Sequence, residues 1–226
     1  MIQKERYRKF CEETPDLPLF FRDWYLDVVC FDGIWDVATV QENGKIVAAL
    51  PYFLKQKGPF RFITMPLMTK HSGPYLIPEK RRLKREHVLF EKLIAQLPET
   101  DYFLQDFRPE THNWLPFYWE KFKQTTRYTY VLDDLSDLEK VHENFNRNIR
   151  RNIRKAEKNL KITSDFSLEI FFEINKMSFD RQSIPIFYSF DFLKKYDAVL
   201  ERNSARKIFF AVDENNEIHA ASYLIW

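Results

Sequence analysis

One run of basic residues could bind phosphate groups. Only Glu157 interrupts it, and its members are Arg147, Arg150, Arg151, Arg154, Lys155, Lys158 and Lys161. Most of these recur at spacings of three and four, so on a helix they stack on one face. Such a face is suited to bind the phosphates of CoA or of an RNA backbone, but a charged run is more often simply a helix surface in water. The candidate polyanion-binding residues are Arg150, Arg151, Arg154 and Lys155.

A second candidate site lies in a loop between two expected helices. Its segment reads DRQSIPIFYS and contains Arg181, Gln182 and Tyr188. Polar loop residues on a rigid scaffold often bind ligands. The alternative is that they only cap a helix and face the solvent, and the residues themselves leave both interpretations open.

The remaining residue types indicate no other chemistry. None of the histidines has metal-ligand spacing with another histidine or cysteine, so no metal site is predicted. His219 lies on an expected half-buried strand, where we expect a hydrogen-bonded core residue. The chain contains no GxSxG motif and no P-loop, and the acidic residues show no interpretable pairing. Catalytic residues therefore stay unassigned.

Composition limits the class of protein. The 226 residues are 45% hydrophobic and 30% charged, with a net charge of only +2, so no global field points to nucleic acid. Two cysteines without a paired spacing argue against a disulfide framework. The N-terminus lacks the apolar core of a signal peptide, and no stretch has the length of a membrane span. We therefore expect a soluble cytoplasmic protein.

Apolar periodicity predicts strands that alternate with helices, which is typical of an α/β fold. Pro51, inside an expected strand, predicts a bulge or an edge position. The expected strands are 35–40, 45–55, 60–65, 102–107, 127–132, 207–212 and 218–226. The expected helices are 18–30, 81–96, 114–123, 135–160, 168–179 and 190–202.

Part of the chain repeats at an offset of 172 residues. The hairpin sequence VATVQENGKIVAALPYF, from Val37, aligns with FFAVDENNEIHAASYLI, from Phe209. The same offset aligns the aromatic helices that precede the two hairpins, with Phe20 on Phe192. We expect two modules, residues 1–134 and 135–226, with superposable hairpins. Because the second copy ends on an apolar strand, we expect the parent protein to continue for roughly 75 residues. An open sheet edge of this kind could also lead to self-association.

The order of helix, hairpin, further strand and helices resembles the opening half of a GNAT module, and tandem modules resemble the FemAB-like branch of that superfamily. The segments that carry the resemblance are FNRNIRRNIRKAEKNLKI, from Phe145, and MSFDRQSIPIFYS, from Met177. The first is similar to the basic helix that links the modules, and the second to the loop between the first two helices of the second module.

The resemblance implies tandem α/β modules with mixed sheets flanked by helices, the second module incomplete. It also implies acyl transfer from acetyl-CoA, another acyl-CoA or aminoacyl-tRNA to an amine or hydroxyl acceptor. The sequence departs from the GNAT pattern at the glycine-rich turn that binds pyrophosphate, where the first module offers only Gly73. A non-catalytic binding module with the same fold therefore stays open as an alternative.

Overall fold

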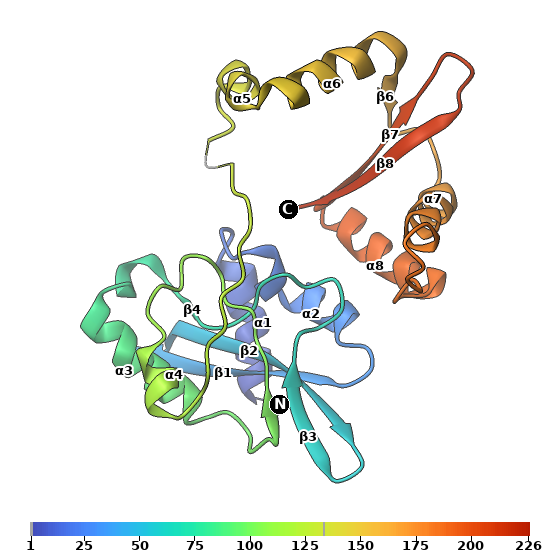
Figure 1. Ribbon diagram of the computed structural model, residues 1–226. Coiled ribbons are helices and arrows are strands. Elements are labelled where there is room, and N and C mark those ends of the chain that lie inside the picture. The colour runs from blue at the N-terminus through green and yellow to red at the C-terminus, as the bar shows by residue number, and fades with distance from the viewer. Residues whose placement is uncertain (1, 133) are drawn as a thin grey trace. The chain divides into compact units, whose positions relative to one another are not determined.

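The computed structural model describes residues 2–132 and 134–226, which form two compact units, Met1–Gln124 and Thr125–Trp226 (Figure 1). Each unit has its own sheet and its own helices. The sheet of the first unit is mixed, and that of the second is antiparallel. No helix among the described residues has both the length and the apolar character to cross a membrane.

The first unit is built on a sheet with strand order β1-β2-β3-β5, in which β4 pairs with β2 and β5 runs parallel to β3. The strands are β1 (Ile34–Glu42), β2 (Lys45–Lys57), β3 (Phe60–Thr64), β4 (Tyr75–Leu76) and β5 (Tyr102–Phe103). The helices are α1 (Ile2–Glu13), η1 (Leu19–Phe21), α2 (Asp23–Val29), η2 (Pro78–Lys80), α3 (Leu83–Ile94) and α4 (Leu115–Trp119).

Both faces of β1 are buried, because helices cover the sheet on each side. Trp35 makes an edge-to-face ring contact with Tyr7 of α1, and Gln3 of α1 donates to the hydroxyl of Thr39. Val40 points to the opposite face. There it joins a core that includes Leu89 and Leu93 of α3 and Phe117 of α4, beside Ala38, Val47, Ala48, Leu50, Leu76 and Phe90.

The proline in β2 forms no bulge. Pro51 pairs with Val37 of β1 in regular register. On its other side, β2 pairs with β4 only at Ala48 and Ala49 and with β3 only from Phe53 onward. The missing N–H of Pro51 falls in this gap, and its carbonyl accepts a 2.9 Å hydrogen bond from Gln105 Nε2. The expected bulge at Pro51 is therefore absent, whereas the expected edge position is found locally, in this gap.

The second unit contains an antiparallel sheet with strand order β6-β7-β8. Its helices are α5 (Leu138–Asn144), α6 (Arg147–Asn159), α7 (Leu168–Asp180) and α8 (Phe190–Arg202), and its strands are β6 (Lys161–Thr163), β7 (Arg206–Val212) and β8 (Ile218–Ile225). The helices α7 and α8 cover one face of this sheet. Tyr223 of β8 contacts the rings of Phe171 in α7 and Tyr196 in α8.

The two hairpins carry the same irregularity, which supports the internal repeat. Val47 has no partner residue in β1, and His219 has none in β7, so each second strand bulges at an equivalent position with the 172-residue offset. The outcome differs, because Val47 is buried while His219 is exposed. The expectation of a core position for His219 was wrong, since no described element covers that part of β8.

Two other expectations fail in the N-terminal part of the second unit. Residues 127–132 have the composition of a strand, but they form none, and Tyr128 and Tyr130 are fully exposed. The single helix expected over 135–160 is divided into α5 and α6. The break lies at Phe145 and Asn146, whose backbones are extended, because the Asn146 side chain accepts a hydrogen bond from the backbone N–H of Ile149 at 3.0 Å and starts a new helix.

Candidate polyanion-binding helix

The basic run lies on α6. Asn146 caps its N-terminus, the helix contains neither glycine nor proline, and it ends where Leu160 turns extended and leads into β6. Six cations project from this one helix, and Arg150 is the only one that is partly buried. They are Arg147, Arg150, Arg151, Arg154, Lys155 and Lys158.

None of these six cations forms an ion pair with a described residue. The salt bridges of the second unit lie elsewhere, for example between Lys194 and Asp191 and between Arg206 and Asp197. The cations of α6 are therefore available to a ligand as far as the described residues are concerned. Cations elsewhere do have acidic partners, such as Lys80 and Arg85 beside Glu42.

The position of these charges works against the helix itself. The first turn of α6 contains no acidic residue, and Arg147 stands at the end of the helix where the macrodipole disfavours positive charge. Pairs such as Arg150 with Arg154 and Arg151 with Lys155 place like charges four residues apart, which is also destabilising. A bound polyanion would relieve both effects, so the charge pattern is better suited to binding than to helix stability.

The loop candidates are divided between surface and core. Arg181 ends α7, where its guanidinium donates to the hydroxyl of Ser178 at 3.3 Å, and Gln182 donates to the Ser178 carbonyl at 3.3 Å. Both side chains are exposed, and both contacts are local to the end of the helix. The structure thus brings Arg181 and Gln182 together at Ser178.

Tyr188 occupies a different environment, because it is buried. Its ring contacts Phe172 and Phe187, and its hydroxyl accepts a hydrogen bond from Asn175 Nδ2. Burial raises the pKa of Tyr188, and the bond from Asn175 opposes that rise. The phenol is therefore engaged inside the unit, and its role in ligand binding stays a prediction.

Gly73 does not provide a phosphate-binding turn of the GNAT type. It adopts φ = +93°, and a Cβ atom there would lie 2.4 Å from Cδ1 of Phe107. The segment after it is the short strand β4, so no helix N-terminus is available at this point. Packing against the Phe107 ring and the positive φ account for this glycine.

The only group of three potential metal ligands among the described residues lies at the β7–β8 turn. Ligand atoms of Asp213, Glu217 and His219 all lie within 4.8 Å of one another. The carboxylate of Asp213 already accepts from the backbone N–H groups of Asn215 and Glu217 and faces His219 Nε2 at 3.2 Å. Turn formation therefore explains the cluster. The sequence gives little sign of this cluster, because two of its three members are carboxylates in an ordinary turn segment, DENNE, and the third is a lone histidine.

The thiol of Cys11 is not poised for nucleophilic catalysis. Both cysteines are buried and free, and burial raises the pKa of the Cys11 thiol to about 12. A thiol with such a pKa is protonated at neutral pH and is a weak nucleophile.

Comparison with known proteins identifies a solved structure of similar fold. The crystal structure of FemX matches with a TM-score of 0.63 at 12% sequence identity, over 93% of this chain. The chain spans 56% of the length of FemX. At this identity the likeness shows the fold alone, and this fold is of the predicted α/β class, with mixed sheets flanked by helices. No protein-family model and no curated protein matches the chain.

Proposed function

We propose that this chain is part of a FemAB-like acyl- or aminoacyltransferase, which moves an acyl group from a polyanionic donor to an amine or hydroxyl acceptor. The observation that carries the proposal is the likeness to FemX, which extends over both units and 93% of the chain. The cations of α6 supply the donor-binding surface. The reaction takes place in the cytoplasm, where aminoacyl-tRNA and acyl-CoA are made.

Of the two donors, α6 is better suited to aminoacyl-tRNA. From Arg147 to Lys158 the helix rises roughly 17 Å, at about 1.5 Å per residue. That length follows several phosphates of an RNA backbone and exceeds a single pyrophosphate. Gly73, the glycine at the position of the CoA turn in the first unit, is explained by Phe107. Acyl-CoA is the alternative donor.

Binding energy from the RNA backbone would hold the acyl ester in place for direct attack by the acceptor. Cations far from the reacting carbonyl contribute by orienting the donor, since orientation alone can lower the barrier by several kcal/mol. In this proposal Arg150, Arg151, Arg154 and Lys155 contact phosphates, and the exposed Arg181 and Gln182 lie on a second surface open to substrate.

The test is a binding titration against salt. We expect tRNA to bind with an affinity that falls as salt rises, with a slope of about 0.7–0.9 for each phosphate contact. A variant with alanine at 150, 151, 154 and 155 should lose up to four such contacts. Arg→Lys changes at 150, 151 and 154 should weaken binding as well if the contacts are bidentate.

A matched control removes the same charge elsewhere. Lys84, Lys92, Lys121 and Lys123 are exposed and have no ion-pair partner among the described residues. Alanine at these four positions should leave the salt slope unchanged. Equal weakening by both quadruple variants would reduce the effect to net charge and would contradict the assignment of α6. If the protein binds acetyl-CoA saturably and only the α6 variant loses this binding, acyl-CoA is the donor. If the protein binds a donor but transfers no acyl group, a non-catalytic binding module is favoured.

A further inference from the structure

An exposed apolar surface lies on the first unit, where α4 packs beside α3. Leu115, Tyr118 and Trp119 share the outer face of α4 and are 43%, 59% and 50% exposed. The ring of Trp119 contacts that of His87 in α3, with centroids 5.1 Å apart. One turn before His87, Leu83 is 66% exposed. The α3–α4 surface is therefore defined by Leu83, Leu115, Tyr118 and Trp119.

The inner face of α4 fixes this surface in place. Phe117 is only 2% exposed and contacts the rings of Phe90 in α3 and Phe103 in β5. The side chains on the outer face of α4 cannot turn inward without the loss of this packing. Neighbouring large apolar side chains that stay exposed on a surface with a polar rim are typical of a binding surface.

Cations without acidic partners flank the α3–α4 surface. Arg82 and Lys84 lie on either side of Leu83 in the sequence, and Lys121 and Lys123 follow the end of α4. All four side chains are exposed, and none forms an ion pair with a described residue. They are therefore available to an anionic partner as far as the described residues are concerned.

The charge balance around this surface is positive. Residues 79–86 and 118–123 contain seven lysines or arginines and three glutamates. The carboxylate of Glu42 adds one negative charge, because it pairs with Lys80 and Arg85. A contact between two copies of this surface would bring like charges together, which is unfavourable. The charge is complementary to an anionic partner instead.

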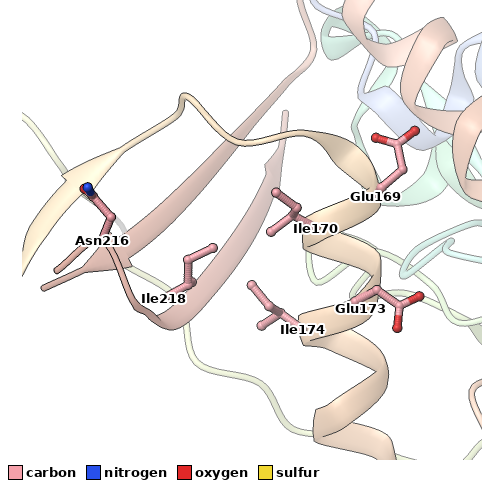
Figure 2. Close-up of a pocket in the computed structure, with 6 residues that line it drawn as sticks. All are labelled: Glu169, Ile170, Glu173, Ile174, Asn216 and Ile218. Carbon is pink, nitrogen blue, oxygen red and sulfur yellow. The ribbon is translucent and has the colours of Figure 1, made fainter.

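A second apolar hollow, in the second unit, differs in charge. Figure 2 shows Ile170 and Ile174 of α7 pointing toward Ile218 of β8. The charged residues of its lining are Glu169 and Glu173, and no lysine or arginine contributes. An anionic partner is repelled there, so this hollow provides a matched apolar control.

We propose that the α3–α4 surface binds peripherally to membranes that contain anionic phospholipids. Tyrosine and tryptophan suit the boundary between headgroups and acyl chains, because each joins an apolar ring to a polar group. Leu83 and Leu115 enter the acyl region, while the flanking cations contact lipid phosphates. RNA would use the rings and the cations but would offer the two leucines no apolar contact. This contact is separate from the donor-binding surface proposed for α6.

Co-sedimentation of the full chain with lipid vesicles tests the proposal. The vesicles contain either phosphatidylcholine alone or phosphatidylcholine and phosphatidylglycerol in equal amounts. We expect at least about tenfold stronger binding to the anionic vesicles, weakened by salt. Alanine at 82, 84, 121 and 123 should lower the partition coefficient by about fivefold for each cation that contacts the membrane. The double variant Tyr118→Ser, Trp119→Ser should lower it at least about tenfold.

A conservative variant guards against misfolding. Brominated acyl chains quench tryptophans that reach them, so anionic vesicles with such lipids should quench the fluorescence of the wild type. Trp119→Phe keeps an aromatic ring against His87 and should retain both its fold and its vesicle binding, yet lose most of this quenching. Undiminished quenching in this variant would place another part of the chain at the membrane and would overturn the proposal.

Two controls separate this surface from the rest of the chain. Because α6 is also basic, the titrations are repeated with alanine at 150, 151, 154 and 155, and the effect of the Tyr118 and Trp119 changes should persist. Ile170→Ser, in the hollow of Figure 2, should leave vesicle binding unchanged. Equal binding to both vesicle types, or loss of vesicle binding only in the α6 variant, would refute the membrane contact and leave the tRNA titration unaffected. If the Tyr118 and Trp119 changes weaken tRNA binding but not vesicle binding, the surface binds RNA and the proposal is wrong.

Discussion

The hydroxyl of Tyr223 donates a 2.6 Å hydrogen bond to the carboxylate of Asp197 and thereby joins β8 to α8. Asp197 is only 7% exposed, and Arg206 of β7 lies 2.9 Å from it through both Nε and Nη2. Burial and the neighbouring carboxylate raise the pKa of Tyr223 far above its ordinary value. Two strands and one helix of the second unit therefore meet at a single buried charge.

This network predicts a large effect of a small change. Asp197→Ala leaves the Arg206 guanidinium with only the more exposed Glu201 carboxylate, 2.9 Å from Nη2, as an ion-pair partner, so the free energy of unfolding should fall by about 1.5–3 kcal/mol. Tyr223→Phe removes one hydrogen bond to the carboxylate and should cost about 1–3 kcal/mol. Urea denaturation measures both. Asp191→Ala, which removes an exposed carboxylate beside Lys194, should change stability little. Equal effects at 191 and 197 would contradict this account.

The pH dependence of the first unit depends in part on Glu42. Hydrogen bonds from Arg85 and Lys80 lower the pKa of this carboxyl to about 2. A carboxyl with a depressed pKa stabilises the fold above its unfolded value of about 4.3, and this contribution is lost as the pH falls through about 2. We therefore expect Glu42→Gln to lower the melting temperature at neutral pH, with a difference from wild type that disappears toward pH 2.

The control for this titration is Glu99→Gln, because Glu99 is exposed and has no ion-pair partner among the described residues. Its melting temperature should follow the wild type at every pH. If Glu42→Gln differs from wild type by the same amount at pH 2 and at pH 7, the ion pairs with Lys80 and Arg85 are not the cause.

Two glycines with positive φ provide a matched pair. Gly73→Ala brings a Cβ to 2.4 Å from the Phe107 ring, whereas Gly44→Ala at φ = +76° meets no atom within 4 Å. Both substitutions incur the left-handed backbone term of about 1–2 kcal/mol, and only Gly73→Ala adds the cost of moving an aromatic ring. Chemical denaturation should therefore show Gly73→Ala to be the less stable variant by at least about 1 kcal/mol. Equal losses would indicate that Phe107 moves freely.

Local pattern was sufficient to predict much of the fold. The hairpins β1–β2 and β7–β8 and the helices α7 and α8 follow from periodicity and turn residues, and the α/β class is confirmed. The cap at Asn146 is also local and could have been predicted, because asparagine followed by a helical pattern is a typical N-cap. Its position inside an unbroken apolar repeat concealed the break between α5 and α6.

Other outcomes depend on contacts that the sequence does not specify. A strand requires a neighbouring strand as well as a composition, so residues 127–132 have the local features of a strand but do not form one. Tyr188, in an expected surface loop, is buried, whereas His219, on an expected half-buried strand, is exposed. Both outcomes depend on which element packs nearby. Nothing in the spacing of Asp197, Arg206 and Tyr223 predicts that they meet, since each lies on a different element.

The charge pattern of α6 leads to a prediction about stability that is independent of any ligand. Replacing Arg150, Arg151, Arg154 and Lys155 with alanine removes four cations, two of them near the N-terminal end of α6. It also removes several like-charge pairs, each worth about 0.2–0.5 kcal/mol, and introduces the best helix former. We expect the free energy of unfolding of the second unit to stay the same or to rise by about 1 kcal/mol. The wild type should gain stability with added salt, which screens the repulsion, and the variant should not. The free energy of unfolding should be measured by urea titration at low and high NaCl, because guanidinium chloride is a salt and would itself screen the charges. A variant that is less stable than the wild type at both salt concentrations would mean that these cations hold the fold together, and any loss of tRNA binding by that variant would then no longer assign them to the ligand.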